Sequence, residues 1–111
     1  MQITTFKQIK EIIEPIPQDQ FCTEVYINEK GQCCLFGHIN KNIAKSSYAD
    51  SHGFGARKLT RMFLSEVHGL ADNIDGAHVN NTLTVNGYTE PEIKDRLMHM
   101  IEDGIKWEES K

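Results

Sequence analysis

The residue types best suited to chemistry gather in one short segment, residues 33–38, which read Cys-Cys-Leu-Phe-Gly-His. A cysteine thiolate is a nucleophile and a metal ligand, and an imidazole serves as a general base or as a metal ligand. The segment follows a turn signal at residues 28–31, Asn-Glu-Lys-Gly. Its groups are therefore the raw material of a nucleophilic site or of a metal site.

A cysteine nucleophile, Cys34 or Cys33, needs a base within hydrogen-bond reach and a third group that orients the base. His38 follows Cys34 by four residues, so one helical turn would bring the two side chains near each other. His78 is a second candidate base, and Asn80 is a candidate orienting group. No established nucleophile signature surrounds the cysteines. The alternative is that Cys34 is a small buried hydrophobic residue, like many free cysteines.

A metal site is less well supported by the spacing. Structural zinc sites draw on paired units such as Cys-x-x-Cys or His-x-x-x-His, and Cys34 with His38 is only half of such a unit. We therefore expect no metal and no cofactor. Residues 51–55, Ser-His-Gly-Phe-Gly, precede Arg57 and Lys58 and would suit an anion at a helix N-terminus. They match no phosphate-binding motif, and a simple loop is the alternative.

The composition is that of a single globular domain over residues 1–111, with 39% hydrophobic and 25% charged residues. The formal net charge is −4, which disfavours binding to the phosphate backbone of nucleic acids. The charge is uneven, because residues 35–65 carry five cations against Asp50 alone. This central basic stretch could hold one anionic group, or it could be solvated surface charge.

The cysteines and the N-terminus bear on the compartment. Three cysteines with a vicinal pair are not typical of a secreted disulfide framework, so we expect reduced thiols. The first residues lead directly into an amphipathic pattern, without the apolar region of a signal peptide. No stretch approaches the roughly 20 apolar residues that cross a membrane. The expectation is a soluble cytoplasmic protein without membrane partners.

Helical spacing is clear at both ends of the chain. Apolar residues recur at spacings of three and four from Phe6 to Ile13, Thr5 and Gln8 can form a capping box, and Pro15 stops the helix. A third helix should end at Gly69, with one apolar face made by Leu59, Met62, Phe63 and Val67. The last helix has an apolar stripe from Ile93 to Ile105, and a second capping box is expected from Thr89 and Glu92.

The middle of the chain predicts a hairpin and then a helix. From residue 21 to residue 28 polar and apolar residues alternate, which indicates a strand, and Gly31 suits a turn with positive φ. The next apolar run is ambiguous between strand and helix. The spacing of Leu35, Ile39 and Ile43 favours a helix over about residues 34–44, which would place Cys34 in a first turn that lowers a thiol pKa.

The fold class predicted from these elements is α+β, with three or four helices packed around a small antiparallel β-hairpin of residues 21–36. The expected core consists of the apolar residues that face inward in this arrangement: Phe6, Ile9, Ile13, Val25, Ile27, Leu35, Leu59, Phe63, Leu97 and Ile101.

Two segments together resemble a family of small bacterial and phage proteins of unknown function. Residues 34–39 are similar to that family's Cys-Ala-Leu-Gly-Ala-Leu block, and residues 79–81 and 89–93 to its Trp-Asn-Asp segment and its Thr-x-Glu-Glu-Val helix start. The resemblance covers residues 21–105, but Val79, Asn81 and His38 replace the family's Trp, Asp and Ala. It implies a bacterial or phage origin and, as a hypothesis, that Cys34, Gly37 and Asn80 lie close together.

For function, the absence of a complete catalytic constellation favours a non-catalytic accessory or binding protein that acts through contact with a protein partner. The alternative is a small cysteine-dependent hydrolase or transferase. In that case Cys34 is the nucleophile, His38 or His78 the base and Asn80 the orienting group.

Overall fold

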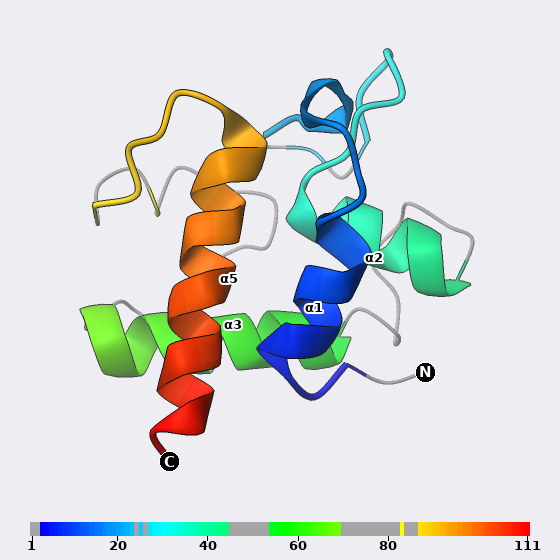
Figure 1. Cartoon of the computed structure of the whole chain (residues 1–111). Coiled ribbons are helices and arrows are strands. Elements are labelled where there is room, and N and C mark those ends of the chain that lie inside the picture. The colour runs from blue at the N-terminus through cyan, green and yellow to red at the C-terminus, as the bar shows by residue number, and fades with distance from the viewer. Residues whose placement is uncertain (1–2, 24, 26, 45–53, 70–82, 84–86) are drawn as a thin grey trace.

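The structure is a computed structural model that describes residues 3–23, 25, 27–44, 54–69, 83 and 87–111. The helices among these residues, in chain order, are α1 (Phe6–Ile13), the short 3-10 helix η1 (Gln18–Gln20), α2 (Leu35–Ala44), α3 (Phe54–His68) and α5 (Ile93–Glu109). Figure 1 shows α1 and α5 side by side, with α3 crossing both of them near the bottom of the view. Within the described ranges, no helix is long and apolar enough to cross a membrane.

Among the described helices, α1 packs most extensively against α5. The Thr5 side chain accepts the Gln8 amide and the Gln8 side chain accepts the Thr5 amide, so the predicted capping box is confirmed. Phe6 is fully buried and packs edge-to-face against Phe63 and Trp107, at centroid distances of 5.4 and 6.3 Å. The three rings join α1, α3 and α5 in one hydrophobic core.

The predicted β-hairpin of residues 21–36 is wrong, and so is the α+β fold class. The fold is mainly helical, and the extended pairing in the described part of the chain is limited to isolated bridges of Cys33 with Phe21 and with Ile27. Phe21 and its neighbour Cys22 are both buried, so side chains do not alternate between two faces as a strand requires. Val25 and Ile27, which we placed in the core, are 45% and 39% exposed.

The turn before α2 is present although the hairpin is not. Gly31 has φ +80° and donates its amide to the Asn28 carbonyl, and the Asn28 side chain accepts the amides of Lys30 and Gln32. The Gln32 side chain then donates to the Asp19 carbonyl, which fixes the turn against η1. The helix favoured for about residues 34–44 is confirmed, since α2 spans Leu35–Ala44. It begins two residues after the bridges at Cys33.

Most of the remaining predicted core is confirmed. Leu59 lies partly buried at its edge, and the fully enclosed members are Phe6, Ile9, Ile13, Leu35, Phe63, Leu97 and Ile101. The predicted capping box of Thr89 and Glu92 is wrong. Glu92 is itself the extended residue before α5 and makes no side-chain cap, so Thr89 lies outside the first turn. Arg96 fixes this end of the helix instead, by donating to the Glu90 carbonyl.

Candidate functional site

Cys34 lies at the N-terminal boundary of α2 and is only 4% exposed. Its carbonyl accepts the His38 amide at 2.9 Å, which is the first hydrogen bond of the helix. Cys34 therefore precedes the first turn that we predicted for it and occupies the capping position. Every residue from Cys33 to Asn40 is buried, so the segment is enclosed on all sides of the helix start.

Two effects oppose each other at the Cys34 thiol. Burial raises its pKa, because the interior disfavours the thiolate, whereas the amides of Gly37 and Phe36 face the sulfur and favour it. Burial is the larger effect, so the pKa of Cys34 lies above its ordinary value. The helix start acts in the predicted direction but does not produce a reactive thiolate.

His38 is a buried histidine with a fixed tautomer. The residue is 5% exposed, its ring lies against Phe21 at a centroid distance of 4.5 Å, and Nε2 is 2.7 Å from the Gln20 carbonyl oxygen. A carbonyl only accepts, so Nε2 carries the proton and donates it. Burial lowers the pKa of His38, although the Gln20 carbonyl favours the charged form, and the ring is neutral near pH 7.

Of the predicted catalytic set, only Cys34 and His38 lie among the residues that the structure describes. His38 uses Nε2 to hold Gln20, and no hydrogen bond in these ranges joins its ring to the Cys34 sulfur. His78 and Asn80 lie outside the described residues, and so does the predicted closeness of Asn80 to Cys34. Within the described ranges, no three His, Cys, Asp or Glu side chains are placed together to hold a metal ion.

The other two cysteines are buried and in the thiol form. Cys22 donates its Sγ hydrogen to the Gln32 carbonyl at 3.2 Å, and its amide donates to the Cys33 carbonyl at 3.0 Å. Burial raises the pKa of Cys22 to about 11, with a smaller contribution from Cys34. Burial also raises the pKa of Cys33. All three thiols therefore act as small core side chains in this geometry.

A shallow cavity of about 410 Å³ lies between η1 and α2. It has an apolar wall from Ile16 and polar groups from Gln20, His38, Lys41 and Asn42. The Asn42 amide donates to the His38 carbonyl, so it is bound within the helix. Its lining residues in the described part of the chain include a cation and a buried neutral imidazole, but no nucleophile.

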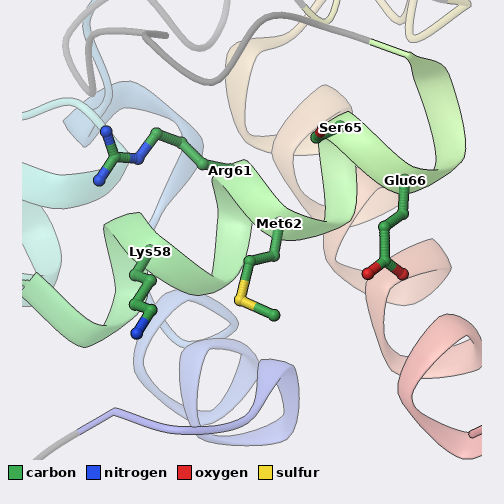
Figure 2. Close-up of a pocket in the computed structure, with 5 residues that line it drawn as sticks. All are labelled: Lys58, Arg61, Met62, Ser65 and Glu66. Atoms are coloured by element: carbon green, nitrogen blue, oxygen red, sulfur yellow. The ribbon is translucent and has the colours of Figure 1, made fainter.

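The outer face of α3 is the surface that the sequence did not reveal. Five residues line a hollow of about 380 Å³ there, and we call them the α3 outer face: Lys58, Arg61, Met62, Ser65 and Glu66. Figure 2 shows Lys58, Met62 and Glu66 projecting from one side of the helix and Arg61 from the other. Met62 is 42% exposed and lies between the charged side chains of this face.

Our assignment of Met62 and Val67 to the inner face of α3 is wrong. The buried face consists of Ala56, Thr60, Phe63 and Leu64, so it is rotated relative to the predicted stripe. Thr60 is tolerated there because its hydroxyl donates to the Ala56 carbonyl at 2.8 Å. Because the buried face includes a threonine, the apolar spacing predicted the wrong face of this helix. The sequence did contain one indication of this, because the helix has more apolar residues than one face can bury.

The far end of the α3 outer face is electrostatically balanced. The Glu66 carboxylate accepts from Trp107 Nε1 at 2.9 Å and from Lys111 Nζ at 3.1 Å. These hydrogen bonds, Lys111 first, hold the pKa of Glu66 below its usual range. Lys111 also lies over the Trp107 ring, 4.0 Å from its centroid. Glu66 therefore anchors α5 and is already occupied within the molecule.

A polar network around the buried Tyr88 lies beside this anchor. The Tyr88 hydroxyl donates to Asp103 Oδ2 at 2.8 Å and lies 3.0 Å from His68 Nε2, so it joins the end of α3 to α5. Burial, followed by the Asp103 hydrogen bond, raises the pKa of Tyr88. His99 Nδ1 contacts the Glu90 carboxylate at 2.9 Å. Tyr88 is 2% exposed, so the network holds structure in place rather than facing a substrate.

Comparison with known proteins gives no relative. The scan against protein-family models, the search of curated proteins and the search of solved structures each found no match to this chain. The resemblance to small bacterial and phage proteins therefore stays a prediction from sequence.

Proposed function

We propose that this protein is a non-catalytic accessory or binding module that acts through contact with another protein, and that the α3 outer face is its contact surface. The observation that carries the proposal is Met62, a large apolar side chain exposed in the middle of a charged hollow. Methionine is enriched in protein interfaces, where an apolar centre is surrounded by a polar rim.

The support beneath α3 strengthens the proposal. Its inner face is held by Phe63 and Leu64 in the core, and Phe63 packs against Phe6 and Trp107. A side chain presented from a helix fixed in this way loses little backbone freedom when a partner binds. The surface is therefore preorganised for contact.

The alternative, a cysteine-dependent hydrolase or transferase, requires a thiolate that a substrate can reach. Cys34 is enclosed and its pKa is raised, and His38 is engaged with Gln20. These observations favour the binding module. The bacterial or phage origin rests on the sequence resemblance and is part of the same proposal.

A capture experiment with matched variants tests the proposal. The immobilised protein, Met62→Glu, Val25→Glu and Cys34→Ala would be exposed to lysate of the natural host, and captured proteins quantified by mass spectrometry. Val25→Glu is the control, because Val25 is also an exposed apolar residue but lies outside α3. We expect a partner that is lost with Met62→Glu alone. Capture that survives Met62→Glu, or that is lost only with a folded Cys34→Ala protein, would contradict the proposal.

A further inference from the structure

The imidazole of His38 has one ring nitrogen that the fold uses and one that it leaves available. Nε2 donates to the Gln20 carbonyl at 2.7 Å, so in the neutral ring Nδ1 carries a lone pair and can only accept. Among the described residues no hydrogen bond reaches Nδ1. His38 is only 5% exposed and lines the cavity of about 410 Å³ between η1 and α2. An acceptor in such a place is satisfied best by a donor that enters the cavity.

The surrounding structure holds the His38 ring in this position. The Gln20 carbonyl also accepts the Cys33 amide at 3.1 Å, so both of its lone pairs are engaged. Phe21 lies against the imidazole at a centroid distance of 4.5 Å. Because the ring is fixed by Gln20 and covered by Phe21, a ligand does not have to order it. Nδ1 is therefore a preorganised hydrogen-bond acceptor.

Lys41 supplies the positive charge of this cavity. It follows His38 by three residues on α2, so the two side chains are neighbours on the helix surface. Burial is the main cause of the lowered pKa of His38, and the charge of Lys41 adds to it, which places the ammonium near the ring. In the part of the chain that the structure describes, Lys41 forms no salt bridge. Its ammonium is therefore available to an anionic group that enters the cavity.

The third feature of the cavity is an apolar wall. Ile16 lines it from the segment between α1 and η1, and its side chain packs partly buried at the edge of the core. A ligand that matches all three features has a hydrogen-bond donor for Nδ1, an anionic group for Lys41 and an apolar part for Ile16. An inorganic anion lacks the apolar part, and a hydrocarbon lacks both polar groups. A cavity of this size is within the range that holds small organic molecules.

We propose that this cavity binds a small hydroxylated organic anion, of the class of α-hydroxy carboxylic acids with an apolar side group. The hydroxyl donates to Nδ1 of His38, the carboxylate pairs with Lys41 and the apolar group lies against Ile16. Because His38 and Lys41 are neighbours on one helix, a hydroxyl and a carboxylate on adjacent carbons suit the pair. The lining residues differ from those of the α3 outer face, so this site adds a small ligand to the proposed protein contact.

Three probes that differ by one group each test the proposal. Mandelate has the hydroxyl, the carboxylate and an apolar ring, phenylacetate lacks the hydroxyl, and benzyl alcohol lacks the carboxylate. Binding to the full-length protein is followed by NMR titration of the imidazole nitrogens, with the His38 signals assigned by comparison with His38→Gln. We expect mandelate to shift the Nδ1 signal of His38 and to leave the proton on Nε2. Phenylacetate should bind about two- to tenfold more weakly, the change expected for one hydrogen bond.

Matched lysine variants test the charge. Lys41→Gln should weaken mandelate about two- to fivefold, as expected for one exposed ion pair, and should leave benzyl alcohol unchanged. Lys106→Gln is the control, because Lys106 is an exposed lysine in the last turn of α5 and does not line the cavity. The proposal is overturned if mandelate leaves the His38 signals unchanged or binds no better than phenylacetate. Equal binding of mandelate to Lys41→Gln and to the native protein would overturn it as well.

Discussion

Gly104 in α5 is a position where a single methyl group should disturb the packing of the core. A Cβ at this position would lie 2.6 Å from the Cδ2 and Cγ atoms of Phe6 and 2.7 Å from its Cε2 atom. Ordinary carbon contacts are about 3.5 to 4.0 Å, so the overlap is about 1 Å against three atoms of one ring. Phe6 cannot move away freely, because it is fully buried against Phe63 and Trp107.

Two opposing terms set the magnitude for Gly104→Ala. Overpacking a close-packed core costs about 1 to 3 kcal/mol, and three ring contacts place this site near the upper end. Alanine gains about 1 kcal/mol over glycine in helix propensity. The free energy of unfolding should therefore fall by about 2 kcal/mol, which lowers Tm by roughly 8 °C or more in a domain of this size.

The assay is thermal and urea unfolding of the native protein, Gly104→Ala, Phe6→Leu and the double variant, followed by circular dichroism. Leucine at position 6 relieves the ring contact, so the double variant should be more stable than the sum of the single effects by about 1 kcal/mol. An unchanged or raised Tm for Gly104→Ala would refute the packing argument. Additive effects in the double variant would show that the loss arises somewhere other than Phe6.

Three further predictions address the candidate site. Burial lowers the pKa of His38 below its unfolded value of 6.5, so the folded state binds fewer protons than the unfolded state near and below that pH. As the pH decreases below about 6.5, the free energy of unfolding should therefore decrease by up to about 1.36 kcal/mol per pH unit. His38→Gln keeps an N–H donor for Gln20 and should flatten that part of the pH profile from urea titrations; a slope that persists unchanged would assign the protonation elsewhere. Cys22, Cys33 and Cys34 are buried thiols with raised pKa values. Iodoacetamide at pH 7 should therefore label the native protein far more slowly than the urea-unfolded protein. Rapid labelling of Cys34 in the native protein would support the alternative in which Cys34 is a nucleophile. Tyr88→Phe removes the hydroxyl that Asp103 and His68 share and should destabilise the fold by about 1 to 3 kcal/mol in denaturant unfolding, whereas an unchanged stability would mean that the network does not hold α3 to α5.

The helices could be predicted where local spacing and tertiary burial agree. In α1, Phe6, Ile9 and Ile13 form one stripe, and the Thr5 cap is local, so the sequence contains the information needed. The hairpin prediction failed because alternation from residue 21 to residue 28 is only a weak local signal. The actual position of this segment depends on Cys33 and Gln32, which are ten or more residues away from Phe21 and Asp19.

The site was harder to predict because it depends on burial, which short motifs do not encode. Cys34 stands at a helix start, as residue spacing suggested, but the sign of its pKa shift depends on how completely the core encloses it. In α3, burial of Thr60 in place of Met62 rotates the helix and exposes the methionine. The burial of Thr60 can be explained only from the structure, in which its hydroxyl donates a hydrogen bond to the Ala56 carbonyl.

The same packing connects the stability of the fold to the proposed contact surface. Phe6 touches Phe63 from the α1 side and would meet any side chain at position 104 of α5, while Phe63 lies in the inner face of α3. A displaced Phe6 ring therefore presses on the helix that presents Met62 and Lys58. Gly104→Ala should weaken a partner at the α3 outer face without touching it, and Phe6→Leu should restore part of that binding, whereas neither change should rescue Met62→Glu. Binding that responds to the buried pair in this way would indicate that the core holds α3 in its binding position, since side chains on an independently mobile helix would not respond to Phe6.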